Sequence, residues 1–235
     1  MRPIHYVVSC EHGGNLVPKA YQHLFQGEEH VLESHKGWDI GALVIAKQIA
    51  NILDSRLIYN KICRLLVECN RSEDSPELFS SYSQKLKDSV KEYILEQYYY
   101  PYREKVEDHI QMHLQDKRVI HLSIHTFTPI WHGTERMVDI GLLFDDNRSN
   151  EIEFCSAWKN AVRDRLPEYT TLLNVPYHGA DDGFTTYLRK QFPEDHYLGI
   201  EIEINQKWVG SEDLTRMVHG LTDALGAAFM EGQSV

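Results

Sequence analysis

Residues 6–18 read YVVSCEHGGNLVP and join an apolar run directly to a polar segment that contains two glycines. The apolar run is rich in β-branched and aromatic residues, which is typical of a buried strand. Gly13 and Gly14 lack a Cβ, so the backbone there can turn sharply or approach a ligand closely. His12 therefore stands at the carboxyl end of a predicted strand, where open α/β sheets place their ligand sites. The alternative interpretation is an ordinary loop histidine beside a Gly-Gly turn.

The rest of the chain alternates predicted strands with predicted helices. Further strands are expected at residues 55–59, 64–68, 118–124, 138–144, 170–174 and 197–204. Helices are expected at residues 18–25, 39–54, 83–115, 150–166, 183–192 and 211–230, with Pro101 breaking the third into two. This order predicts a single α/β domain over residues 1–235, in which helices cover both faces of a mostly parallel or mixed sheet.

Composition restricts the partners of the chain. Its 235 residues are 42% hydrophobic, which is enough for one sizeable core. Its net charge of -11 argues against nonspecific binding to nucleic acid or to anionic membranes. No signal peptide or transmembrane segment is evident, so a cytoplasmic protein is expected. The cysteines form no CxxC pair and are expected to be free, buried thiols; they are Cys10, Cys63, Cys69 and Cys155.

Polar side chains follow several of the predicted strands. His12 and His125 each come after an apolar run, and Glu201 and Glu203 share one face of the last strand because they are two residues apart. The carboxyl ends of parallel strands meet at one edge of the sheet, so these side chains should converge there. Two imidazoles, a carboxylate and a nearby glutamate are the parts of a catalytic zinc site with an open position for water. The alternative is two hydrogen-bonded histidines in a pocket without metal.

Asp39 is the candidate for the third metal ligand, although a helix N-cap would explain this residue equally well. Asn15 lies three residues after His12, where a glutamate would complete an HxxE metal motif. Asparagine is a poor zinc ligand, so Asn15 is expected to hold the substrate or the turn. Glu11 is expected to point away from His12 if the strand geometry persists.

Arg71 is the candidate anion clamp, because a guanidinium group can hold a carboxylate through two parallel hydrogen bonds. Its alternative role is a surface ion pair with Glu73 or Asp74. Asn70 precedes Arg71 and is expected to assist it, and the loop carrying Tyr177 is expected to close over the pocket.

Glu203 or Glu201 is the candidate general base, since a charged residue inside an apolar strand is costly unless it is paired or used. A structural ion pair with Arg or Lys is the alternative for one of them. A cysteine amidase with Cys10 as nucleophile and His12 as base is a rival interpretation. The two residues lie too close together on one extended stretch to favour such a dyad.

The chain resembles the N-formylglutamate amidohydrolase family in seven segments that occur in the same order. They are VVSCEHGGNLVP (7–18), WDIGA (38–42), SRLIY through ECNRS (55–72), SIHTF (123–127), VDIGLLFD (138–145), NVPYHGADDGFT (174–185) and GIEIEINQ (199–206). The resemblance implies a phosphorylase/hydrolase-like α/β/α sandwich, similar to that of zinc-dependent exopeptidases. It also implies hydrolysis of N-formyl-L-glutamate to formate and glutamate.

The resemblance implies that His12 and His125 are metal ligands and makes Asp39 more attractive as the third. The pair Asn70-Arg71 resembles the Asn-Arg pair with which zinc carboxypeptidases hold a substrate carboxylate. Glu203 or Glu201 resembles their base, with Glu203 favoured because Asn205-Gln206 follow it. The chain departs from the family at Asn15, which replaces a ligand glutamate of carboxypeptidases. It also carries Glu-His-Gly-Gly-Asn where formylglutamate hydrolases more often have a Pro-His-Ser-Gly-type run, which points to a different N-acyl substrate.

The predicted activity is therefore metal-assisted hydrolysis of the amide bond of a small N-acyl amino acid, with one zinc ion, in a monomer or homodimer. Two other functions remain open at this point. One is a noncatalytic protein that binds a carboxylated metabolite, and the other is a peptidase similar to metallo-carboxypeptidases.

Overall fold

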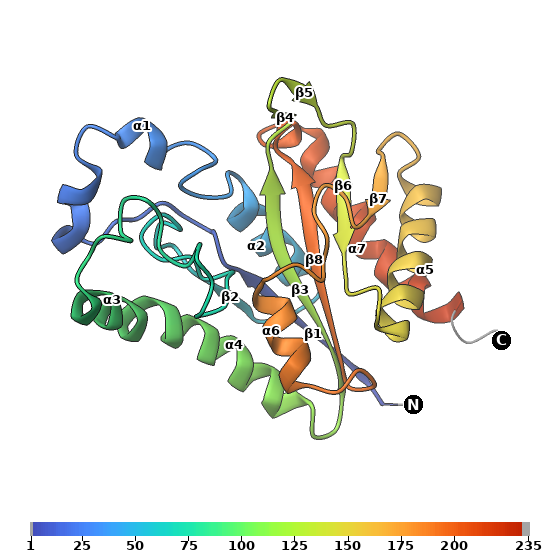
Figure 1. Cartoon of the computed structure of the whole chain (residues 1–235). Helices are drawn as coiled ribbons and strands as arrows, with labels where there is room; N and C mark the ends of the chain where they lie inside the picture. The colour runs from blue at the N-terminus through green and yellow to red at the C-terminus, as the bar shows by residue number, and fades with distance from the viewer. Residues whose placement is uncertain (1, 232–235) are drawn as a thin grey trace.

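The computed structural model describes residues 2–231, and the side chains of residues 2–226. Its centre is a six-stranded sheet (Figure 1). In spatial order the strands are β2 (Leu57–Tyr59), β1 (Ile4–Cys10), β3 (Arg118–Phe127), β8 (Tyr197–Asn205), β6 (Ile140–Leu143) and β7 (Thr171–Leu173). The first four strands are parallel, whereas β6 pairs with β8 in the antiparallel direction and β7 is parallel to β6. The sheet is thus mostly parallel with a reversed pair at one edge.

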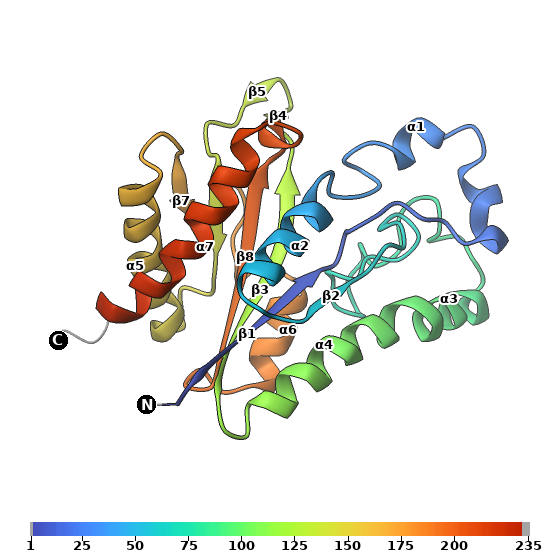
Figure 2. The same ribbon diagram turned by 180° about the vertical axis from the view of Figure 1, so that it is seen from behind.

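Helices cover both faces of this sheet. One face carries α2 (Ala42–Ile52), α5 (Ser149–Arg165) and α7 (Asp213–Glu231), which lie in front in Figure 2. The other face carries α4 (Tyr100–His113) and α6 (Phe184–Gln191), which lie in front in Figure 1. Shorter helices are the 3₁₀ segments Lys19–Phe25 and Gln206–Trp208, α1 (Glu29–Leu32), α3 (Asp88–Ile94) and the π-helical segment Leu95–Tyr99. The predicted α/β class with helices on both faces of a mixed sheet is confirmed.

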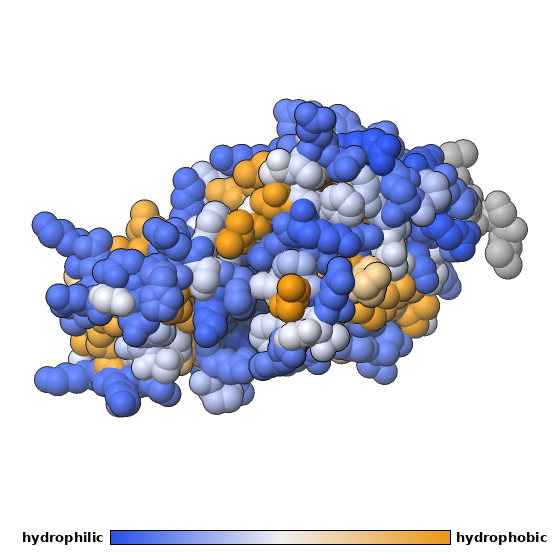
Figure 3. All heavy atoms as spheres, turned by 90° about the horizontal axis from the view of Figure 1, so that it is seen from above, coloured by the Kyte–Doolittle hydropathy of each residue, from blue (hydrophilic) through white to orange (hydrophobic). Residues whose placement is uncertain are grey.

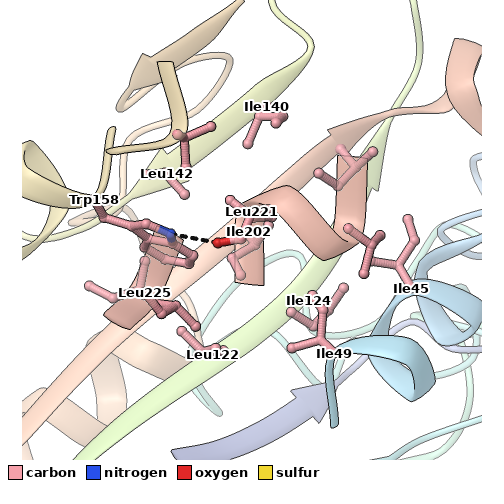
Figure 4. Close-up of a cluster of buried hydrophobic side chains, with 14 of the residues drawn as sticks. Ile45, Ile49, Leu122, Ile124, Ile140, Leu142, Trp158, Ile202, Leu221 and Leu225 are labelled. Carbon is pink, nitrogen blue, oxygen red and sulfur yellow. Dashed lines mark hydrogen bonds between the residues drawn. The ribbon is translucent and has the colours of Figure 1, made fainter. Parts of the chain in front are cut away.

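Two hydrophobic clusters hold the layers together, one on each face of the sheet. Side chains alternate between the faces along each strand, so Val8 packs in the cluster under α2, α5 and α7 while Val7 packs in the cluster under α4. Figure 4 shows Trp158 of α5 against Leu221 and Leu225 of α7. The Trp158 indole donates a hydrogen bond of 2.9 Å to the Leu221 carbonyl, so its polar atom is satisfied although the side chain is fully buried.

Trp158→Ala is expected to lower the free energy of unfolding by about 3–5 kcal/mol, because it removes a large buried side chain and leaves a cavity. The measurement is urea denaturation of the two proteins. Trp131→Ala is the matched control, since Trp131 is 46% exposed and its loss should change stability by only about 0.5 kcal/mol. Equal losses in the two variants would contradict this account of the core.

The predicted strand at 64–68 is wrong. This segment forms turns, in which the Leu66 amide bonds the Cys63 carbonyl and the Glu68 amide bonds the Leu78 carbonyl. Leu66 and Val67 are nevertheless fully buried in the cluster on the α4 face. A short apolar run reports burial, and burial alone does not distinguish a strand from a packed loop.

The predicted division into two helices is found just before Pro101, as a π-helical segment rather than as a gap in the helix. The helix starts at Asp88 rather than at residue 83 and continues through the π-helical segment 95–99 into α4. Pro101 occupies the first turn of α4, where the lack of a backbone N–H is tolerated. In the π-helical segment just before it, the Tyr100 amide donates to the Leu95 carbonyl five residues earlier.

Within residues 2–231, none of the helices has both the length and the apolar character needed to span a bilayer. All four cysteines are buried and unbridged, as predicted.

Candidate active site

The carboxyl edge of the parallel strands carries a cavity of about 650 Å³. Figure 3 looks down on this edge and shows a mostly hydrophilic face with a few hydrophobic side chains scattered over it. The strands β1, β3 and β8 are neighbours in the sheet, so the residues at their ends come together here. The cavity is lined by His12, His35, Lys36, Asp39, Arg64, Leu65, Asn70, Arg71, His125, Ile130, Trp131, His132, Tyr177, His178, Asp181, Asp182, Glu201 and Glu203.

His12, Asp39 and His125 meet at one point of the cavity. His12 Nδ1 lies 3.2 Å from Asp39 Oδ2, and His125 Nδ1 lies 2.9 Å from the same oxygen. All three side chains are buried, and one potential ligand atom of each lies within 4.8 Å of the other two. The two histidines that the sequence places at separate strand ends are therefore adjacent, with the predicted carboxylate between them.

Each imidazole is held from behind by a second carboxylate. His125 Nε2 lies 3.1 Å from Glu11 Oε2, and His12 Nε2 contacts Glu68 Oε1. Metal-ligating histidines usually pair their second ring nitrogen with a carboxylate in this way, which fixes the ring and leaves the other nitrogen for the ion. Two Nδ1 atoms and a carboxylate oxygen are a donor set that suits zinc or a similar divalent ion. The chemistry of the residues thus fits a metal centre.

Glu11 is the most completely enclosed carboxylate of the site. It is fully buried and accepts hydrogen bonds from Ser9 (2.7 Å), Tyr102 (2.6 Å) and Ser123 (2.5 Å). Burial alone would raise the pKa of Glu11, but its interactions with His125 and with the hydroxyl groups of Ser123 and Tyr102 outweigh burial and lower the pKa. Glu11 is not among the residues that line the cavity, and it contacts the site through His125.

Arg64 connects Asp39 with Glu68. Its Nη1 donates to Asp39 Oδ1 over 3.1 Å, and its Nε donates to Glu68 Oε2 over 2.6 Å. Burial opposes ionisation of Asp39, yet His12, His125 and Arg64 together hold its pKa well below the ordinary value. The N-cap interpretation of Asp39 is wrong, because α2 has Gly41 at its N-cap and no side-chain cap.

Glu201 and Glu203 both reach the cavity from β8, but their environments differ. Glu201 Oε1 accepts a hydrogen bond of 2.6 Å from the Thr185 hydroxyl. Glu203 lies opposite His125 in the β3–β8 pairing, and its buried Oε2 has no hydrogen-bond partner within the described part of the chain. Burial, reinforced by the negative charges of Asp39 and Glu201, raises the pKa of Glu203 to about 8.

The structure brings most of the predicted substrate-binding residues to the cavity. Arg71, Asn70 and Tyr177 line it, whereas Asn15 does not and instead donates its side-chain amide to the Leu32 carbonyl over 3.0 Å. Arg71 also forms an ion pair, which was the alternative expected for it. Its partner is Glu77, at 3.0 Å, rather than Glu73 or Asp74.

Two further contacts fix the Asn70-Arg71 pair at the wall of the cavity. Arg71 Nη1 donates to the Asp182 carbonyl over 2.9 Å, and Asn70 Oδ1 accepts from the Phe184 amide over 2.7 Å. The loop before α6 thereby holds the pair in place.

Cys10 is unsuited to be a nucleophile. Its side chain is fully buried, does not line the cavity, and burial raises the pKa of the thiol well above the ordinary value. A cysteine nucleophile needs an accessible thiolate. The geometry therefore disfavours the cysteine amidase interpretation.

Known proteins resemble this chain in sequence and in fold. A family model described as N-formylglutamate amidohydrolase matches residues 4–209. The solved structure of a gene product from Agrobacterium tumefaciens is 26% identical, with a TM-score of 0.81 over 97% of this chain and 92% of that chain. The N-formylglutamate amidohydrolase from Ralstonia eutropha JMP134 is 17% identical, with a TM-score of 0.70 over 100% of this chain and 96% of that one, which is a likeness of fold. A search of curated protein sequences found no match. Because the family model spans most of its length, the chain belongs to the N-formylglutamate amidohydrolase family.

Proposed function

We propose that the protein is a metal-dependent amidohydrolase that cleaves the N-acyl amide bond of an amino acid such as N-formylglutamate. Membership of the family supports an amidohydrolase-type activity. The observation that carries the proposal for metal dependence is the meeting of His12 Nδ1, His125 Nδ1 and Asp39 Oδ2 in the cavity, with a carboxylate behind each ring.

His12, His125 and Asp39 would hold the ion, with zinc as the expected metal. A divalent ion bound there would supply Lewis-acid activation of water and of the amide carbonyl. Glu11 and Glu68 keep the two imidazoles in the orientation that presents Nδ1 to the cavity. Burial of the three ligands excludes competing water from the remaining sides of the group.

Glu203 is the proposed general base. It pairs with His125 across the sheet and lines the cavity, and its buried Oε2 has no hydrogen-bond partner among the described residues, whereas Glu201 accepts a hydrogen bond from Thr185. Glu203 takes the proton of the attacking water and returns it to the nitrogen of the leaving amino acid. The raised pKa supports this role, because a base whose pKa is near neutral also returns the proton readily.

Arg71, with Asn70 beside it, is proposed to hold the carboxylate of the substrate. Arg71→Ala should raise KM for N-acyl amino acids by roughly 10- to 100-fold, because a hydrogen bond to a charged group contributes about 1.5–3 kcal/mol. The control substrate is the same compound with its carboxylate converted to a carboxamide, for which the variant and the wild type should differ little. Equal losses on both substrates would assign Arg71 a structural role instead.

The proposed function is tested by removing and restoring metal. Protein treated with a chelator should lose hydrolysis of formyl- and acetyl-amino acids, and addition of zinc, cobalt or manganese should restore it. Hydrolysis at the full rate by metal-free protein would refute the proposed mechanism. Tight binding of N-acyl amino acids to the metal-loaded protein without turnover would instead favour the noncatalytic binding function.

A further inference from the structure

A second group of histidines lies at the opposite end of the sheet from the candidate active site. His5 is the second residue of β1, and His109 and His113 lie on α4. The four-residue spacing puts the two α4 histidines on the same face of the helix. One ring nitrogen of each of the three lies within 4.8 Å of the other two. We call these three residues the α4–β1 histidine cluster.

The rings of the cluster are in direct contact. His5 and His113 are stacked, with ring centroids 3.6 Å apart and planes inclined by 28°. His109 meets His113 edge to face at 4.8 Å and meets His5 at 5.6 Å. Chain segments about a hundred residues apart in sequence thus bring three imidazoles together. Ordinary apolar side chains would pack these segments equally well, so packing alone does not require histidines here.

Several ring nitrogens of the cluster are buried away from solvent. Both ring nitrogens of His109, which is only 8% exposed, and Nε2 of His5 make no hydrogen bond to any described residue. A buried polar atom left unsatisfied costs about 1–3 kcal/mol, so a native protein that keeps such atoms calls for an explanation. A cation bound there would engage one nitrogen of each ring.

The cluster also has the correct charge state for a ligand. Burial lowers the pKa values of His5, to about 4, and of His109 and His113. The imidazoles are therefore neutral at pH 7, and neutral imidazole is the metal-binding form. Nitrogen donors of this kind prefer zinc, nickel and copper to magnesium or calcium.

We propose that His5, His109 and His113 form a second binding site, for a divalent transition-metal ion, that ties the start of β1 to the C-terminal end of α4. This site does not depend on the proposed hydrolase function. It shares no residue with the cavity at the carboxyl edge and lies at the other end of β1.

The test is to count the zinc bound by the full-length protein, prepared without a histidine tag, stripped with a chelator and titrated by calorimetry. His113→Gln is expected to bind one equivalent fewer than the wild type, and added zinc is expected to raise its Tm less. His109→Gln should behave in the same way. His219→Gln, which replaces an exposed histidine of α7, is the matched control and should keep the wild-type number.

The outcome separates this proposal from the proposed function. If both sites bind, the wild type takes up two equivalents and His113→Gln takes up one. If the active site binds no metal, the wild type takes up one equivalent and His113→Gln takes up none. An unchanged number of bound ions in His113→Gln would refute the proposal. His113 is only half-buried, so this variant decides the matter even if His109→Gln fails to fold.

Discussion

Asp39→Asn is expected to abolish metal binding at the active site and to reduce hydrolysis to the level of metal-free protein. Asp39 Oδ2 stands between the Nδ1 atoms of His12 and His125, so removal of its charge would take away one of the three proposed ligands. Asparagine has nearly the same shape, and Arg64 can still donate to its side-chain oxygen. A loss of metal binding in this variant would therefore result from the missing charged donor and not from a collapse of the site.

The control for Asp39→Asn is Glu68→Gln, which alters a residue that contacts His12 and Arg64 but is not one of the three proposed ligands. Residues that orient a ligand contribute about 10- to 100-fold in metal affinity, so Glu68→Gln should weaken binding by that amount and Asp39→Asn by considerably more. Calorimetric titration with zinc gives both values. Both substitutions are introduced into His113→Gln protein, in which the active site is the single proposed site that can still bind zinc. Equal effects in the two variants would mean that Asp39 positions the histidines and is not itself a ligand.

Glu203→Gln is expected to lower kcat by about 10²–10⁴-fold while the bound metal is retained. The amide keeps the size of the side chain but cannot accept the proton of water. KM should change little, because Glu203 is not proposed to hold the substrate carboxylate. Steady-state kinetics with metal analysis of the same samples provides the measurement.

Glu201→Gln is the matched control, because Glu201 lies on the same face of β8 and also lines the cavity. Glu201→Gln should lower kcat much less than Glu203→Gln, because the Glu201 carboxylate already accepts a hydrogen bond from the Thr185 hydroxyl. A larger loss in Glu201→Gln than in Glu203→Gln would transfer the role of base to Glu201.

The pH profile gives an independent view of Glu203. Its pKa is raised to about 8 by burial and by nearby negative charges, and a bound cation would lower that value. A base must be ionised to act, so kcat/KM should rise with pH on the acid side, with a midpoint below pH 8. This acid limb should be absent from the residual activity of Glu203→Gln.

The convergence of His12, His125 and Glu203 follows from the sequence because a parallel sheet aligns the carboxyl ends of its strands. Each residue sits at or near the end of an apolar run, and the strands that carry them are adjacent. Local pattern therefore suffices for these three positions. It also suffices for the helices that cover the sheet, whose ends differ from the predicted ones by only a few residues.

The residues behind the histidines are a different case. Glu68 lies in an apolar run that resembles a strand but forms turns, and its contact with His12 joins residues 56 positions apart. Arg64 lies four residues before Glu68 in the same segment, and its contacts with Asp39 and Glu68 could not be predicted from the sequence pattern either. Glu11 is next to His12 in the sequence, but its pairing with His125 depends on the neighbouring strand β3. Such contacts arise from tertiary packing, which periodicity does not encode.

The reversed direction of β6 determines where the chain can vary. β6 is antiparallel to β8, with Ile140 opposite Ile204, so β6 starts at the same edge at which β3 ends. The connection at 128–139, which includes the exposed strands β4 (Ile130–Trp131) and β5 (Thr134–Glu135), stays at the mouth of the cavity without crossing the sheet. Exposed connections accept new sequences and new lengths at small energetic cost. Substitutions in this one segment can therefore change what enters the cavity, while the sheet beneath it stays unaltered.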